Sequence, residues 1–194
     1  MSRRNKARVL LLPALVITAG CSINPGHSGQ SEPVAGTADP RIRTTMEAGD
    51  FAKALPMLEQ HVATSPEDVG AKVNLAIAYR ETGQLDRALD VLEKAVAQDP
   101  NQAAAQDQLG IVCRQLGQFD RALEAYKKAI RIDEHYALAH RNLGILYDIY
   151  LQQPSAALTE YERYVELTGQ PDAEVNGWVT DLKRRTTAAQ ARAK

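Results

Sequence analysis

Two stretches of the chain repeat one another at an interval of 34 residues. Residues 83–100 read GQLDRALDVLEKAVAQDP and residues 117–134 read GQFDRALEAYKKAIRIDE, with nine of the eighteen aligned positions identical. Repeats of about 20 to 50 residues are small units of secondary structure, and each unit buries its apolar side only by stacking on its neighbour. The chain is therefore expected to fold as a stack of repeated units.

Apolar and small residues recur within each copy at the spacing of amphipathic helices. In the first copy, Leu75, Ala76 and Tyr79 share one helical face, and Gly83 follows, which suits the left-handed conformation after a helix end. A second apolar face then comes from Leu85, Ala88, Leu92 and Ala95. The pattern recurs 34 residues later, where Cys113 takes the place of Tyr79 and is expected to be a small buried hydrophobe. Each copy thus predicts two helices joined by a glycine turn.

The interval and the paired helices resemble the tetratricopeptide repeat. The resemblance covers residues 39–168. It implies an all-α solenoid of antiparallel helix pairs, with about three full repeats after a degenerate N-terminal repeat. A last amphipathic helix over residues 171–190 is expected to cap the stack, and its Trp178 to pack on the fourth repeat rather than stack on a ligand.

Two places depart from the regular pattern. In the fourth repeat, Ala157, Tyr161 and Tyr164 come one residue late, and no glycine separates the helices. We therefore expect a longer first helix there and a turn at residues 153–154. In the degenerate repeat, Pro56 is expected near the first turn of its helix, where proline is tolerated.

Residues 1–20 have the pattern of an export signal. A basic start is followed by an apolar run, Val9–Ala19, of eleven residues. This run is shorter than the roughly 20 residues that a membrane span needs, so it is typical of a signal peptide. The next residues, Ala-Gly-Cys ending at Cys21, resemble the bacterial lipobox, which implies lipidation of Cys21. The alternative is an ordinary secretory signal followed by a chance cysteine.

The residues after Cys21 bear on where such an anchored chain would lie. In lipoproteins of this kind, Asp directly after the lipidated cysteine tends to retain the protein in the inner membrane. The residue here is Ser22, so the resemblance implies the outer membrane, with the folded part on the periplasmic face. Residues 21–38 are rich in Gly, Pro and Ser without a hydrophobic period, which predicts a flexible linker.

The resemblance also implies that the first helix of each pair lines a concave groove for a protein or peptide partner. Three ladders of residues are candidates for that groove. They are the amides Asn74, Gln108 and Asn142, the isoleucines Ile77, Ile111 and Ile145, and the arginines Arg80, Arg114 and Arg141. Side-chain amides can donate to and accept from the backbone of an extended peptide. The alternative is that the amides tie adjacent helices together and the isoleucines are partly core.

The sequence carries no motif of a catalytic or metal site. None of the four histidines has a metal-binding spacing, and no GxSxG, Walker A or dinucleotide fingerprint occurs. We therefore expect no enzyme activity, no cofactor, no metal and no small-molecule substrate. A formal net charge of −1 argues against binding to nucleic acid.

These observations favour an outer-membrane lipoprotein that holds or assembles partner proteins. Such a chain looks like the small repeat-bearing lipoproteins that accompany secretin and pilus machines, in a pilotin-like role. One alternative is an adaptor for cell-wall enzymes or proteases, and another is an unrecognised hydrolase or metal protein. The basic tail favours the dipole of its helix, or alternatively contacts anionic lipid or cell wall, through Lys183, Arg184, Arg185, Arg192 and Lys194.

Overall fold

The computed structural model describes residues 39–169 and 172–192. The predicted signal peptide, Cys21 and the linker to residue 38 lie outside the described residues. The helices are α1 (Pro40–Glu47), α2 (Phe51–Thr64), α3 (Val69–Glu81), α4 (Leu85–Gln98), α5 (Ala103–Gln115), α6 (Phe119–Ile132), α7 (Ala137–Ile145), the π-helical turn η1 (Leu146–Tyr150), α8 (Pro154–Thr168) and α9 (Ala173–Arg192). The described ranges contain no strand.

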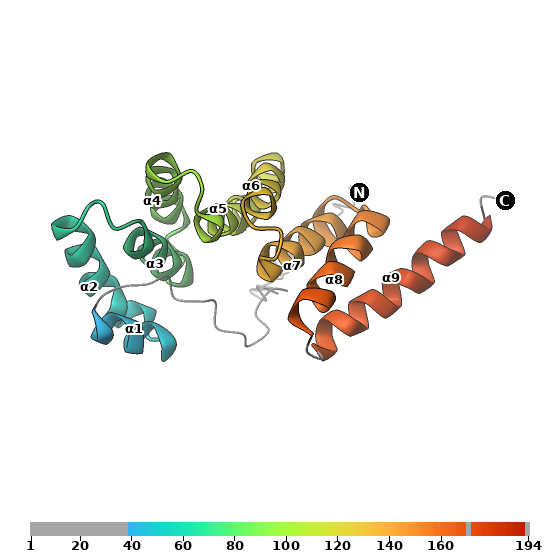
Figure 1. Ribbon diagram of the computed structural model, residues 1–194, viewed down its shortest axis with the longest axis horizontal. Helices are drawn as coiled ribbons and strands as arrows, with labels where there is room; N and C mark the ends of the chain where they lie inside the picture. The colour runs from blue at the N-terminus through green and yellow to red at the C-terminus, as the bar shows by residue number, and fades with distance from the viewer. Residues whose placement is uncertain (1–38, 170–171, 193–194) are drawn as a thin grey trace, which may run out of the picture.

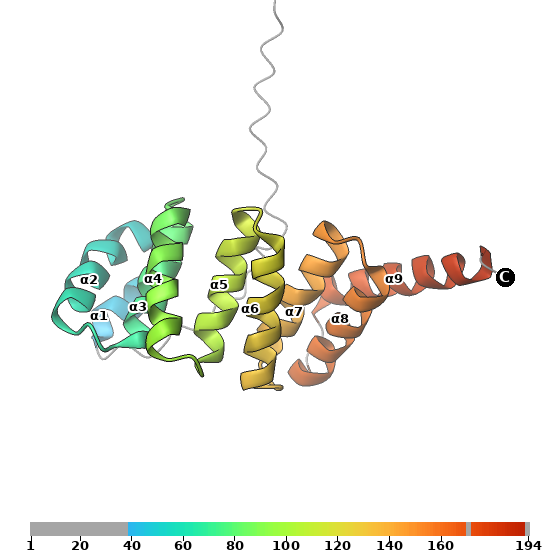
Figure 2. The ribbon, with the colours of Figure 1, turned by 90° about the horizontal axis from the view of Figure 1, so that it is seen from above.

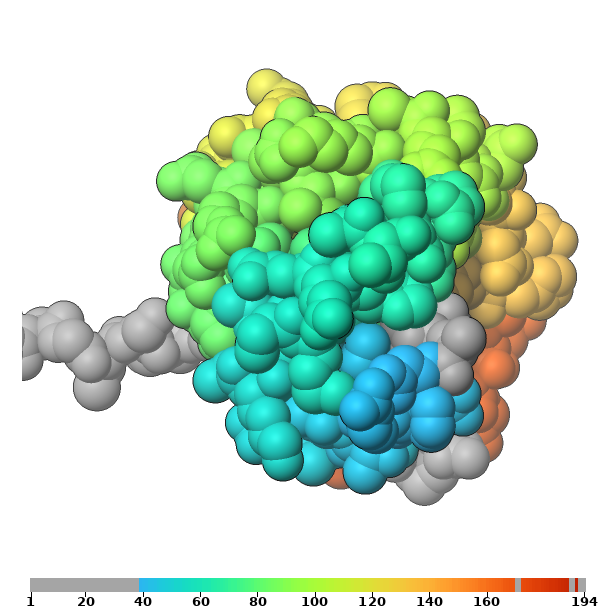
Figure 3. All heavy atoms as spheres, turned by 90° about the vertical axis from the view of Figure 1, so that its left-hand side faces the viewer, coloured from blue at the N-terminus to red at the C-terminus, as the bar shows by residue number. Residues whose placement is uncertain are grey.

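The helices form an arc of antiparallel pairs (Figures 1 and 2). In Figure 1, α3, α5 and α7 make an inner row, and α4 and α6 lie above them. Figure 3 shows α1 and α2 covering the N-terminal end of the stack. The predicted all-α solenoid of paired helices, with a degenerate first pair and a final capping helix, is confirmed.

Local sequence signals explain where the first helices begin. Asp39, Asp50 and Asp68 each precede a helix and accept a hydrogen bond from a backbone N–H of its first turn. The distance is 2.8 Å from Arg41 N to Asp39 and 2.8 Å from Ala71 N to Asp68. A carboxylate at this place satisfies an N–H that has no partner inside the helix.

Glycine makes the turn inside each of the first three pairs. Gly49, Gly83 and Gly117 have φ values of 71°, 79° and 74°, in the left-handed region that only glycine adopts without strain. The residue after each glycine then donates back across the helix end. Gln84 N lies 2.7 Å from the carbonyl oxygen of Tyr79, which is the pattern of a Schellman cap.

The fourth pair absorbs its extra residue in a π-helical turn. The helix that begins at Ala137 continues through η1 and ends at Tyr150, so it has fourteen residues where α3 and α5 have thirteen. Gln152, with φ 52°, takes the left-handed position that glycine holds elsewhere. Gln153 N donates to Tyr147 O at 2.8 Å and closes the turn one residue later than in the other pairs. The structure agrees with the prediction of a longer first helix.

The core is continuous along the stack and is built from small residues facing large ones. Tyr126 and Tyr161 are 0% and 1% exposed, and their rings pack against Gly110 and Gly144. The second pair solves the same fit with Ala76 and Leu92. Because the helix backbone at a glycine lies close to the ring, each tyrosine fills the space between its two helices.

Two sequence expectations concern the ends of the stack. Pro56 is the sixth residue of α2, one turn deeper than expected, because the helix begins at Phe51. It removes one intrahelical hydrogen bond, which a short terminal helix tolerates on its outer side. At the other end, Trp178 of α9 packs on Tyr161 of α8 with a centroid distance of 5.2 Å, as predicted.

Candidate functional site

The predicted ladder of amides lies in one register along the inner row. Asn74 of α3, Gln108 of α5 and Asn142 of α7 occupy equivalent positions of consecutive inner helices, and all three side chains are buried. The structure therefore brings the ladder together as the 34-residue spacing required. Its role in holding a partner stays a prediction.

Asn142 ties two inner helices through a buried carboxylate. Its Nδ2 donates to both carboxylate oxygens of Asp107, at 3.0 and 3.1 Å. Asp107 is 0% exposed. The sequence analysis missed Asp107, although an acid inside a helix whose neighbours are small or apolar was the available signal. The pair shows that an amide of this ladder does connect α5 to α7.

The side chains of the predicted arginines are largely buried, and each is held by aromatic or acidic neighbours. Arg114 donates to the hydroxyls of Tyr126 and Tyr150, each at 3.3 Å, and its guanidinium lies 5.6 Å from the centroid of the Tyr150 ring. Burial raises the pKa of the Tyr126 hydroxyl, although Arg114 beside it acts in the opposite direction. Tyr126 is therefore neutral and accepts a hydrogen bond from Arg114.

The other two arginines lie towards the two ends of the row. Arg80 pairs with Glu81 at 2.7 Å, and Arg141 lies 3.7 Å from the Glu174 carboxylate of α9. The Arg141 guanidinium also lies 5.6 Å from the ring centroid of Trp178. The inner helices α3, α5 and α7 thus each contribute one largely buried cation, so the inner row carries a repeated positive feature.

The predicted isoleucines belong to the apolar core. Ile77, Ile111 and Ile145 are all buried, and each lies in an apolar cluster between the helices. Their side chains hold the inner row to its neighbours, as the alternative interpretation required. Cys113 is buried as expected, and burial raises the pKa of its thiol.

The outer face carries a repeated ion pair that the sequence analysis missed. Arg87 lies 2.9 Å from Glu59, and Arg121 lies 2.5 Å from Glu93, so each arginine joins its helix to the preceding outer helix. The signal was available as two Glu and two Arg that are each 34 residues apart. Lys127 stands where the third glutamate would fall, so the last junction of the stack is built differently.

Two further findings concern only the described part of the chain. No group of three or more His, Cys, Asp or Glu residues there could hold a metal ion. No helix in the described ranges is long and apolar enough to cross a membrane.

The repeated helix pairs, their stacking and their inner row of polar side chains define an α-solenoid of the protein-interaction class. Two family models match the sequence, one described as tetratricopeptide repeat over residues 45–109 and one as TPR repeat over residues 110–148. Together they span more than half of the chain. The chain belongs to the tetratricopeptide repeat family, whose repeats act as scaffolds for protein–protein interaction.

Solved structures share this fold. MamA is 22% identical over 78% of this chain and 87% of that chain, with a TM-score of 0.65. TTC0263, a thermophilic TPR protein of Thermus thermophilus, is 26% identical over 73% and 77%, with a TM-score of 0.64. PilF of Pseudomonas aeruginosa is 18% identical over 76% and 67%, with a TM-score of 0.69. A search of curated proteins found no match.

Proposed function

We propose that this protein is a lipid-anchored scaffold on the periplasmic face of the bacterial outer membrane. It holds a protein partner along its inner row of helices and assists the assembly of an envelope machine such as a secretin or a pilus. It does so without catalysis. The observation that carries the proposal is the row of equivalent polar side chains that consecutive inner helices present, one per repeat, at Asn74, Gln108 and Asn142.

The sequence before the solenoid supports the anchor. Cys21 follows Ala19 and Gly20 after a short apolar run, and a lipidated cysteine at this place leaves a linker up to residue 38. Two or more acyl chains give stable membrane attachment, whereas one chain gives only weak attachment. A scaffold on such a linker remains at the membrane while its helices reach a partner.

The likeness to solved structures supports an envelope role only at the level of the fold. PilF of Pseudomonas aeruginosa has the same arrangement of helix pairs over most of this chain. The sequence also looks like that of small lipoproteins that accompany secretin and pilus machines. A stack of repeats with no catalytic motif is suited to holding a subunit in position during assembly.

The anchor is tested by replacing Cys21 with Ser and following the chain by membrane fractionation and by incorporation of a labelled fatty acid. We expect the unchanged chain to fractionate with the outer membrane and to carry label, and Cys21→Ser to lose both. A Cys21→Ser chain that still fractionates with the outer membrane would contradict the anchor.

The scaffold role is tested by cross-linking in cells and mass spectrometry of the captured proteins. We expect a secretin or pilus subunit in the unchanged protein, and its loss when Asn74, Gln108 and Asn142 are replaced together with Ala. The matched control replaces the exposed outer-helix residues Asp90, Lys94 and Glu124 with Ala. Circular dichroism and a melting curve confirm that both variants are folded. Capture of wall enzymes in place of assembly subunits would favour the adaptor role.

A further inference from the structure

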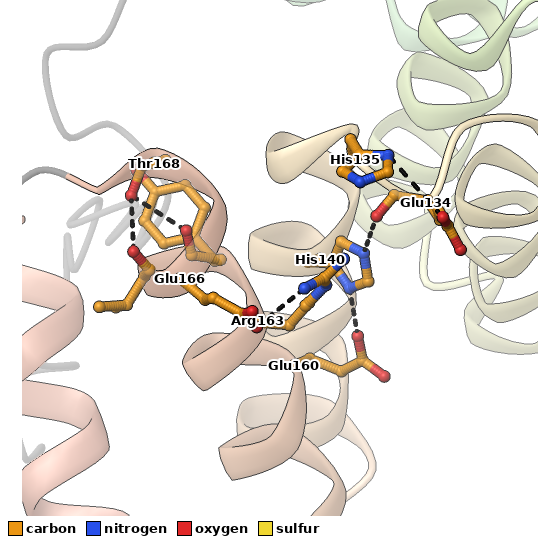
Figure 4. A network of polar contacts seen from close by, with 9 residues as sticks. Glu134, His135, His140, Glu160, Arg163, Glu166 and Thr168 are labelled. Atoms are coloured by element: carbon orange, nitrogen blue, oxygen red, sulfur yellow. Dashed lines mark hydrogen bonds and ion pairs between the residues drawn. The ribbon is translucent and has the colours of Figure 1, made fainter.

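His140 makes a three-way contact between the third and fourth helix pairs (Figure 4). Its Nδ1 lies 2.7 Å from Oε2 of Glu160 in α8, and its Nε2 lies 3.1 Å from the backbone carbonyl oxygen of Glu134, in the turn after α6. The His140 side chain is 8% exposed. One imidazole therefore joins the end of the third pair to both helices of the fourth pair.

These two contacts determine how many protons the site holds. A carbonyl oxygen only accepts hydrogen bonds, so Nε2 of His140 carries a proton. A second proton lies between Nδ1 and the Glu160 carboxylate, because two lone pairs 2.7 Å apart would repel. The pair therefore holds one proton more than a neutral histidine beside an ionised glutamate, and the two residues share it.

We infer that His140 and Glu160 form a proton-dependent clasp that fixes the fourth helix pair against the third. With the shared proton in place, the clasp is closed. When the pH rises, the proton passes to hydroxide, and the bare Nδ1 of His140 is left facing a carboxylate. That contact is repulsive, so the Glu160 side chain turns away and α8 loses its connection to the turn after α6.

Charged side chains from each packed element act on this proton. On α8, Arg163 lies on the side that carries Glu160 and pairs with Glu166 at 2.8 Å. On α6, Lys127 holds the register position of Glu93, which faces the next outer helix. Both cations favour release of the shared proton, whereas the acids of the turn oppose it. The turn contributes Asp133, Glu134 and His135, and α7 itself contributes Arg141.

The second helix pair makes a similar three-way connection with groups that keep their charge near neutral pH. Lys72, two repeats before His140, contacts Oε1 of Gln98 at the end of α4. Gln98 Nε2 in turn donates to the carbonyl oxygen of Glu67, in the turn before α3, at 2.7 Å. The fourth pair thus builds the connection from a histidine and a carboxylate, which gives it a dependence on pH.

The proton count is tested by NMR of the purified full chain, with labelled histidine nitrogens and glutamate carboxyl carbons. His135, whose side chain is 68% exposed, is the internal control, because an exposed histidine loses its proton near pH about 6.5. We expect the His140–Glu160 pair to retain the extra proton at a pH where His135 has lost it. Loss of that proton in step with His135 would overturn the clasp.

The structural consequence is tested by hydrogen exchange of the α8 amides from pH 6 to 9, corrected for the intrinsic rate. We expect protection in the unchanged chain to fall about tenfold as the shared proton is released, since a charge-assisted hydrogen bond is lost. In Glu160→Gln the carboxamide donates to a neutral Nδ1, so protection should not change with pH. His140→Gln, which copies Gln106 of the preceding repeat, should lack the step as well. An equal fall in all three proteins would overturn the proposal.

Discussion

Gly110 of α5 lies directly against the ring of Tyr126 in α6: a Cβ atom at Gly110 would come within 2.5 Å of the nearest ring carbon. The ring is 0% exposed and is enclosed between the two helices, so it has little room to move. A helix would ordinarily gain stability from replacing glycine with alanine. Here the close approach of the two side chains reverses that gain.

Replacing Gly110 with Ala is expected to lower the free energy of unfolding by about 1–3 kcal/mol, because the added methyl overpacks the core. Gly177 of α9 is the matched control, since a Cβ there meets nothing within 4 Å. Gly177→Ala should raise the free energy of unfolding by about 0.5–1 kcal/mol. Urea unfolding curves of the two variants measure both effects, and a stabilised Gly110→Ala would contradict the packing described.

Replacing Gln152 with Gly is expected to stabilise the fold by about 1 kcal/mol, because Gln152 has a left-handed φ of 52°. The reverse control is Gly117→Ala, at φ 74°, where a Cβ meets no neighbour and only backbone strain is added. That change should destabilise the fold by about the same amount. Thermal melting of the two variants should give shifts of opposite sign, and shifts of the same sign would refute the role given to Gln152.

The ion pair between Arg121 and Glu93 is expected to contribute less than about 1 kcal/mol, because both side chains are about half exposed. A double-mutant cycle with Arg121→Ala and Glu93→Ala measures the coupling between them. We expect the coupling to fall in high salt, where the Debye length is roughly 3 Å at 1 M. A coupling that salt leaves unchanged would show that the two side chains are linked by something other than charge.

Tyr79 predicts a loss of stability in alkali. Burial, together with the bonded Glu59 carboxylate, raises the pKa of its hydroxyl to about 12, above the value of about 10 in an unfolded chain. The unfolded state then releases its proton first, so the contribution is fully present below pH about 10 and is lost towards pH about 12. Tyr79→Phe should show a smaller decline of the unfolding free energy over this range, measured by urea titration. An unchanged decline would mean that Tyr79 is not the group responsible.

The helix pairs were predictable from the sequence because they depend on local signals that recur. Gly83 and Gly117 mark the turns, and the one-residue delay at Tyr161 predicted the longer helix of the fourth pair. The form of that longer helix was not predictable. A π-helical turn and a longer α-helix both absorb one residue, and the choice depends on keeping Tyr161 against Gly144.

The polar contacts of the inner row were harder to predict. The ladder of Asn74, Gln108 and Asn142 followed from the period, but its partner Asp107 did not, because a single buried acid has no repeat to reveal it. The contact of His140 with Glu160 joins residues twenty positions apart in two helices. Its geometry depends on how α7 and α8 cross, which the spacing of apolar residues does not determine.

The π-helical turn at Leu146–Tyr150 has a consequence for the design of longer arrays from this chain. A polymer built by duplicating the fourth pair would have a unit one residue longer than a polymer built from the third. Since superhelical pitch accumulates from the small rotation between neighbouring units, the two polymers would wind differently while sharing the same backbone chemistry. A single inserted amino acid is thus a natural adjustment of curvature, available to an engineer as well as to evolution.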